Sequence, residues 1–156
     1  MAAAVAEAHR VMRRGGVLLA VQPTDQRPVL EVWQAPAGAA PLSDADAETA
    51  RRDVLGPLIP DPDSRREFTA TLAALAEAVD DSEAEAAFEP AAVRAFNYYQ
   101  LFDSLDDLTD YLDDTPEFAR APDDLLERAA VALNGTPGQA RLVIVQRTAV
   151  VALHKP

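Results

Sequence analysis

The feature that most constrains the fold is a short apolar run over residues 17–21, Val-Leu-Leu-Ala-Val, directly after a pair of glycines. A run of this length without polar alternation favours a strand covered on both faces, as in an α/β sheet. Before it, residues 4–13 carry apolar side chains at helical spacing, including Val11 and Met12. The pattern therefore predicts an amphipathic helix that the glycines at 15 and 16 terminate.

The same criteria divide the rest of the chain into short elements. A serine followed three residues later by an acidic residue marks a helix start at Ser43, Ser64 and Ser104. Together the patterns predict helices over 43–56, 64–80, from 104, and over 122–134, and strands over 29–33, 93–102, 141–146 and 150–153, with a break near Thr148. We expect Leu72 and Leu75 to be buried in the second of these helices, and Leu108 and Leu125 in the last two. This order predicts a mixed α/β fold, and the length predicts a single domain over residues 1–156.

Charge and composition exclude several classes of partner. The formal net charge is −12, and such a surface repels nucleic-acid phosphates and anionic lipid. The chain has no Cys, which removes disulfides, thiolate metal sites and thiol nucleophiles. No apolar run approaches the roughly 18 residues that span a bilayer, and the first residues lack the order of a secretory signal. We therefore expect a soluble, cytoplasmic protein without nucleic-acid or membrane partners.

Residues 6–19, Ala-Glu-Ala-His-Arg-Val-Met-Arg-Arg-Gly-Gly-Val-Leu-Leu, are similar to a stretch of class I S-adenosylmethionine-dependent methyltransferases. In that family a helix ends in an Arg-Val-Leu-Lys/Arg-Pro-Gly-Gly turn that leads into the fifth strand of the sheet. Here Met12 replaces the usual Leu and Arg14 the usual Pro, while the paired glycines keep the freedom of the turn. Weaker similarity continues over residues 102–108, 125–129 and the closing strands. The resemblance implies the carboxyl-terminal part of a Rossmann-like methyltransferase sheet, with three to five strands flanked by helices.

The cofactor-binding elements of that family are not found in this sequence. They consist of a Gly-rich turn after the first strand and an acidic residue one strand later, whereas the six glycines here are scattered. No residue is therefore assigned to cofactor binding, and we expect the isolated chain to bind no S-adenosylmethionine. The cofactor would enter only if another chain supplied the missing half.

Three residues after the first predicted strand are the candidates for a substrate cleft. Gln22, Thr24 and Asp25 lie where ligands bind in open α/β sheets, beyond the carboxyl end of a strand. If the resemblance holds, they resemble the rim of the methyl-acceptor cleft. Their alternative role is to cap the strand and satisfy the loop backbone.

The other polar and aromatic residues favour structural roles. His9 and His154, the two imidazoles, lie far apart in sequence, and we expect His9 on the solvent side of the first helix. The aspartates between 103 and 114 lack the Gly and terminal Glu of a calcium loop and favour a solvated helix. We expect Trp33, Tyr98 and Tyr99 in the core. No metal site and no catalytic residue is assigned.

Three interpretations of function remain open. The chain is the substrate-side half of a methyltransferase that is inactive until another chain supplies the cofactor half, or a non-catalytic relic that dimerises or binds a protein partner, or a full enzyme whose start is missing. In the family, the strand that resembles residues 17–21 lies inside the sheet. Without the preceding strands it would lie at an edge with uncovered apolar surface, and such an edge templates pairing with another chain. We therefore expect a homodimer or a complex with a complementary chain.

Overall fold

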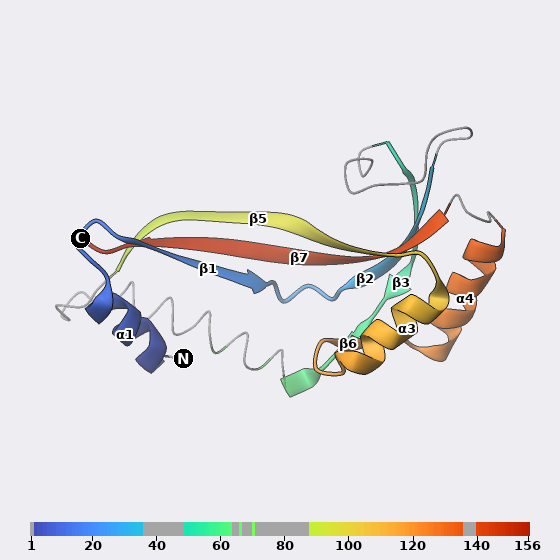
Figure 1. Cartoon of the computed structure of the whole chain (residues 1–156), viewed down its shortest axis with the longest axis horizontal. Helices are drawn as coiled ribbons and strands as arrows, with labels where there is room; N and C mark the ends of the chain where they lie inside the picture. The colour runs from blue at the N-terminus through green and yellow to red at the C-terminus, as the bar shows by residue number, and fades with distance from the viewer. Residues whose placement is uncertain (1, 36–48, 64–65, 67–69, 71–87, 136–139) are drawn as a thin grey trace. The chain divides into compact units, whose positions relative to one another are not determined.

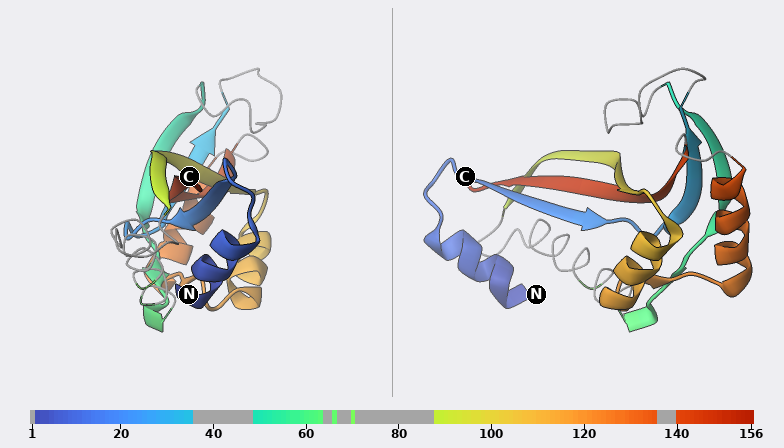
Figure 2. Two further views of the ribbon diagram at one scale, coloured as in Figure 1. Left: turned by 90° about the vertical axis from the view of Figure 1, so that its left-hand side faces the viewer. Right: turned by 45° about the vertical axis from the view of Figure 1, so that its right-hand side comes forward.

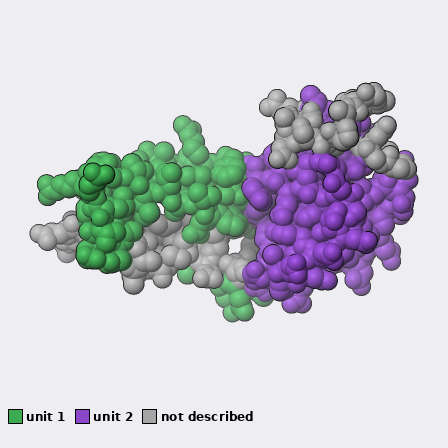
Figure 3. Space-filling model, in the orientation of Figure 1, with its two compact units in different colours: residues 1–25, 62–96, 147–156 green, residues 26–61, 97–146 purple. Residues whose placement is uncertain are grey.

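The computed structural model describes residues 2–35, 49–63, 66, 70, 88–135 and 140–156 of the chain (Figure 1). The chain divides into two compact units, which Figure 3 colours separately. Two long strands, β5 (Glu89–Phe102) and β7 (Ala140–His154), contribute residues to both units. Unit 1 comprises Met1–Asp25, Pro62–Phe96 and Arg147–Pro156, and unit 2 comprises Gln26–Asp61 and Asn97–Gln146.

In unit 1 a helix leads through a glycine turn into a strand that pairs with the last strand of the chain. The helix is α1 (Ala2–Val11), and the strand, β1 (Val17–Pro23), runs antiparallel to the second part of β7. Gly15 has a φ of 76°, a conformation that favours glycine. Its N–H donates to the carbonyl of Lys155 (2.8 Å), and the Lys155 N–H donates to the carbonyl of Gly16 (2.9 Å). The turn predicted from the paired glycines is thus fixed to the end of β7.

One face of β1 is packed and the other is open. Successive side chains of a strand point to opposite faces, and Leu18 and Ala20 pack with Met12 against the buried Phe88 and Leu153. On the opposite face three large apolar side chains are more than half exposed, namely Val17 (54%), Leu19 (62%) and Val21 (59%). The prediction of a strand covered on both faces is therefore wrong, because Met12 and Phe88 cover only one.

The end of α1 is held by Lys155. Its Nζ donates to the carbonyls of His9 (2.6 Å) and Met12 (2.9 Å), which places a positive charge at the helix carboxyl end, where it is stabilising. His9 is buried, with its ring edge-on to that of Phe88 at 4.9 Å between centroids. The prediction of a solvent-facing His9 is wrong: the helix ends at Val11, which is exposed, and the packed side of this region includes His9 and Met12.

The sheet of unit 2 is antiparallel. β2 (Val29–Gln34) lies between β3 (Arg51–Pro57) and the first part of β7 and pairs with both. Two very short strands, β4 (Ile59–Pro60) and β6 (Ala119–Arg120), form a separate pair. The predicted helix over 43–56 is wrong from residue 49 onward: residues 49 and 50 form a turn, and from Arg51 the pairing with β2 overrides the local capping pattern. Its first residues, 43–48, lie outside the described part of the chain, as does most of the helix predicted over 64–80, including Leu72 and Leu75.

Two helices cover one face of this sheet (Figure 2). α3 (Leu105–Asp114) begins at Ser104, whose hydroxyl accepts a hydrogen bond from the Asp107 N–H at 3.0 Å, as an N-cap does. α4 (Asp123–Asn134) follows Pro122 and ends at Gly135. Both helices are confirmed. Their buried side chains form one core with those of the sheet: Leu30, Val32, Leu58, Phe102, Leu108, Leu112, Ala119, Leu125, Ala129, Ala140, Leu142 and Ile144.

The opposite face of this sheet carries a smaller cluster around Trp33 and Val143. The Trp33 ring is fully buried and meets the ring of Tyr99 edge-on at 5.0 Å. The Arg52 guanidinium lies over the indole at 4.4 Å, and the indole N–H donates to Glu31 at 2.7 Å. The core position predicted for Trp33 is confirmed, and Tyr99 is partly buried against it, whereas the prediction for Tyr98 is wrong because this residue is more than half exposed.

The described residues form a mixed α/β structure with a mostly antiparallel five-stranded sheet, a two-stranded pair and three helices. The strands predicted over 29–33 and 93–102 are confirmed within β2 and β5. The predicted break near Thr148 is wrong, because β7 is continuous and Thr148 pairs with Pro23; a β-branched residue fits a strand well. No helix in the described ranges has the length and apolarity needed to cross a membrane.

Candidate functional site

The three predicted cleft residues lie at the end of β1 in unit 1. Of the three, Gln22 alone lies within β1, opposite Ala149 of β7, and Thr24 and Asp25 follow the strand. The Thr24 N–H donates to the Arg147 carbonyl at 2.7 Å, and the Asp25 side chain is exposed. A site was predicted here because ligands bind beyond the carboxyl ends of the strands in open α/β sheets. The strand beside β1 is antiparallel, so its carboxyl end does not lie next to that of β1. The substrate role of these residues stays a prediction.

The two histidines are placed by different contacts of unit 1. Burial, and then the charge of the Lys155 ammonium, lower the pKa of His9. His154 lies in the last position of β7, with its Nδ1 3.8 Å from a carboxylate oxygen of Glu89. Among the described residues, no three His, Cys, Asp or Glu side chains gather as metal ligands would.

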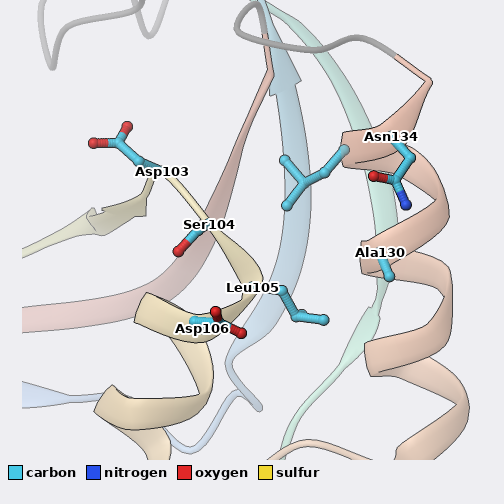
Figure 4. A pocket seen from close by; sticks show the side chains of 7 residues that line it. Asp103, Ser104, Leu105, Asp106, Ala130 and Asn134 are labelled. Atoms are coloured by element: carbon cyan, nitrogen blue, oxygen red, sulfur yellow. The ribbon is translucent and has the colours of Figure 1, made fainter.

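A pocket of about 340 Å³ lies between the start of α3 and the end of α4 in unit 2 (Figure 4). Two of its polar side chains have partners within the protein: the Ser104 hydroxyl donates to Asp107 Oδ2 at 2.7 Å, and Arg141 Nε lies 2.6 Å from Asp103 Oδ1. Ser104 has no imidazole beside it in the pocket, so it lacks the general base that activates a serine nucleophile. The lining residues are Asp103, Ser104, Leu105, Asp106, Ala130, Leu133 and Asn134.

A second pocket of about 350 Å³ lies farther along the same two helices, beside β6. Arg120 contributes a cation, and Asp113 and Asp123 contribute carboxylates. The acidic residues of α3 are exposed, as predicted for a solvated helix. Neither pocket includes Gln22, Thr24 or Asp25. The lining residues are Thr109, Leu112, Asp113, Arg120, Ala121, Asp123 and Leu126.

One side of β1 has no neighbouring strand among the described residues. In an antiparallel ladder, alternate residues turn their N–H and C=O groups toward the neighbouring strand. The Gly16 carbonyl accepts a hydrogen bond from Lys155, the residue after β7, and the Thr24 N–H donates to the carbonyl of Arg147 in β7. Even-numbered residues of β1 therefore turn toward β7, and the odd-numbered ones turn away.

Val17, Leu19 and Val21 consequently carry both outward backbone groups and exposed apolar side chains. We call these three residues the β1 edge. In the described part of the chain, β1 is the last strand in the sheet order and has β7 as its strand neighbour. Residues 17–24 include no Lys, Arg, Asp or Glu, so the β1 edge lacks the charged residues with which proteins commonly block an edge strand.

The unit 1 part of β5 is also exposed, but its sequence differs. Val93 is 65% exposed and Phe96 is exposed as well. Arg94 lies within this stretch, and a charge is one device that discourages strand addition. Each of the two strands also has a proline near one end, Pro23 in β1 and Pro90 in β5. The exposure of β5 was not predicted, because a run rich in aromatic and β-branched residues indicates a strand but not its coverage.

Comparisons of the chain with protein-family models, with curated proteins and with solved structures find no match.

Proposed function

We propose that this chain is a protein-association module that takes another polypeptide strand onto the β1 edge. The observation that carries the proposal is the coincidence, on Val17, Leu19 and Val21, of outward backbone groups with side chains that are 54–62% exposed. A strand added there would satisfy the backbone groups and cover apolar surface in the same step.

The backbone supplies the affinity of such an addition and the side chains supply its register. An unpaired edge offers a row of donors and acceptors that a new strand completes. Side chains directly opposite each other across an antiparallel pair contact each other on the same face, so an incoming strand with apolar residues at alternate positions matches the β1 edge. A strand with charged residues at those positions does not.

The substrate-side portion of a class I methyltransferase is a second candidate function, and one observation favours it. The glycine turn leads from α1 into β1, as the resemblance implies, and β1 pairs with β7, the last strand of the chain. Under this proposal the sheet is a partial Rossmann-like methyltransferase sheet. The added strand belongs to a chain with the S-adenosylmethionine site, and Gln22, Thr24 and Asp25 line the methyl-acceptor cleft.

A labelled peptide of residues 13–25 tests whether the β1 edge accepts a strand. Fluorescence anisotropy should show saturable binding of this peptide to the chain. Leu19→Pro removes an N–H that points away from β7, so it should weaken binding at least about tenfold while leaving the β1–β7 ladder in place. Leu19→Lys should also weaken binding, because it places a charge on the β1 edge. This variant replaces Leu19→Pro in the test if the proline variant fails to fold. Val131→Lys, on the exposed side of α4, should bind as the unmodified chain does.

The proposed association function is wrong if folded Leu19→Pro and Leu19→Lys chains bind the peptide as tightly as the unmodified chain. Calorimetry with S-adenosylmethionine addresses the second candidate separately. We expect no binding heat with the isolated chain, and heat only with a chain that completes the fold. Micromolar affinity of the isolated chain would contradict the assignment of the cofactor site to another chain.

A further inference from the structure

We propose that the strand taken up by the β1 edge is β1 of a second copy, paired antiparallel about Leu19 with two-fold symmetry. This inference rests on the proposed association function and names its partner. Three properties of β1 support it: the direction of its backbone groups, the symmetry of its apolar side chains, and the charges at its two ends.

The backbone of the β1 edge is self-complementary. Val17 and Val21 lie equally far from Leu19, and all three turn their N–H and C=O groups outward. In an antiparallel pair centred on Leu19, Val17 faces Val21 of the second copy, and Leu19 faces its own equivalent. Each copy then donates and accepts the same set of hydrogen bonds, so the contact is isologous and closes as a dimer.

The side chains follow the same symmetry. Directly opposed residues of an antiparallel pair lie on the same face, so the exposed Val17, Leu19 and Val21 of one copy adjoin those of the other. Six apolar side chains would then form one continuous row. In a single copy each of these residues is more than half exposed, so the pairing would remove apolar surface from water.

The charges beside β1 favour the antiparallel direction. The exposed charges beside the strand are Arg13 and Arg14 before it and Asp25 and Arg27 after it, and Arg13 and Asp25 lie equally far in sequence from Leu19. Antiparallel pairing about Leu19 brings the Arg13 end of one copy toward the Asp25 end of the other, whereas parallel pairing would bring like charges together. This local complementarity opposes the general repulsion between two chains that each carry a net charge of −12. The corresponding part of β5 has the charged residue Arg94 within it, whereas β1 has no charged residue within the strand.

Sedimentation and engineered cysteines together test the symmetric pair. The chain should sediment as a dimer at high micromolar concentration, and Leu19→Lys should raise the dissociation constant at least about tenfold relative to Val131→Lys. Because the chain has no Cys, single substitutions give unambiguous disulfides. Opposed residues of a hydrogen-bonded antiparallel pair have Cα atoms about 5.5 Å apart, within disulfide range.

The cysteine pattern distinguishes this register from others. Leu19→Cys should form a disulfide-linked dimer under mild oxidation, and Val17→Cys alone should not. A mixture of Val17→Cys and Val21→Cys chains should cross-link. In the peptide of residues 13–25, methylation of the Leu19 amide nitrogen should abolish binding, because this N–H points toward the β1 edge of the chain. Methylation of the Ala20 amide nitrogen should not abolish binding, because that N–H points away from it.

Each contrary outcome has a defined meaning. A chain that stays monomeric at high micromolar concentration while still binding the peptide overturns the second copy as partner and leaves the association function standing. A dimer that Leu19→Lys weakens, but in which Val17→Cys cross-links to itself, overturns the Leu19-centred register. A dimer that survives Leu19→Lys and Leu19→Pro, in a chain that does not bind the peptide, overturns both the inference and the proposed function.

Discussion

The two units contain similar strands but bury them differently. In unit 2, three consecutive residues of β7, Leu142, Val143 and Ile144, are almost completely buried, because α3 and α4 cover one face and the Trp33 cluster occupies the other. In unit 1, β7 is equally apolar over residues 149–153, yet Leu153 alone among these is buried. An apolar sequence therefore determines that a strand forms, whereas the elements packed on it determine whether the strand is covered.

The largest expected effect lies in the core of unit 2. Leu125 on α4 is 1% exposed and packs in the core that the helices share with the sheet. Leu125→Ala should lower the free energy of unfolding by about 2–5 kcal/mol, because it removes apolar contacts and leaves a cavity. Chemical denaturation followed by circular dichroism measures this change.

Val131→Ala is the control for that substitution, because Val131 lies on the same helix and is 73% exposed. Its effect should stay within about 0.5 kcal/mol. Equal losses of unfolding free energy for the two variants would contradict the prediction, because they would show that the buried and exposed sides of α4 contribute equally to stability.

The helices of unit 2 were predictable because local signals agreed with tertiary packing. Ser104 and Asp107 mark the start of α3, and Pro122 and Gly135 bound α4. The strand β3 was missed because Arg51, Arg52 and Asp53 show no strand pattern, and pairing with β2 decides their conformation. Such pairing joins segments far apart in sequence, which local patterns do not register.

The candidate sites were predictable to a lesser degree. The sequence and the methyltransferase resemblance led to an exposed edge over residues 17–21, and β1 does end the sheet order among the described strands. The burial of His9 and the role of Lys155 were missed, because they depend on bringing the end of the chain against α1. No periodicity in residues 2–11 indicates a contact with residue 155.

An intermediate effect is expected where Lys155 holds α1 in unit 1. Lys155→Met keeps much of the apolar stem but removes the ammonium that donates to the carbonyls of His9 and Met12. The loss should be about 1–2 kcal/mol, smaller than that of Leu125→Ala, because the freed carbonyls can bond water. Hydrogen exchange resolved by residue should show faster exchange in α1, with α3 and α4 unchanged. Uniformly faster exchange in all three helices would mean that the two units do not open separately.

The smallest expected effect is a dependence of stability on pH that originates at His9 in unit 1. Burial first, and the Lys155 ammonium second, lower the pKa of His9 in the folded chain. As the pH falls below about 6.5, the usual value for an unfolded histidine, the unfolded chain binds a proton at His9 more readily than the folded chain does. Stability is therefore complete above that pH and declines as the pH falls toward the folded-state pKa. The hydrogen bond from Arg10 lowers the pKa of Glu7, so the contribution of that carboxylate is lost only at more acidic pH. Denaturation between pH 5 and 7.5 measures the decline. His9→Phe should flatten the decline over this range, since an apolar ring can occupy the site beside Phe88 without titrating. Lys155→Met should raise the His9 pKa by removing the nearby positive charge. An NMR titration that gave His9 a midpoint at or above that of an unfolded histidine would contradict both the buried position and the proximity of Lys155.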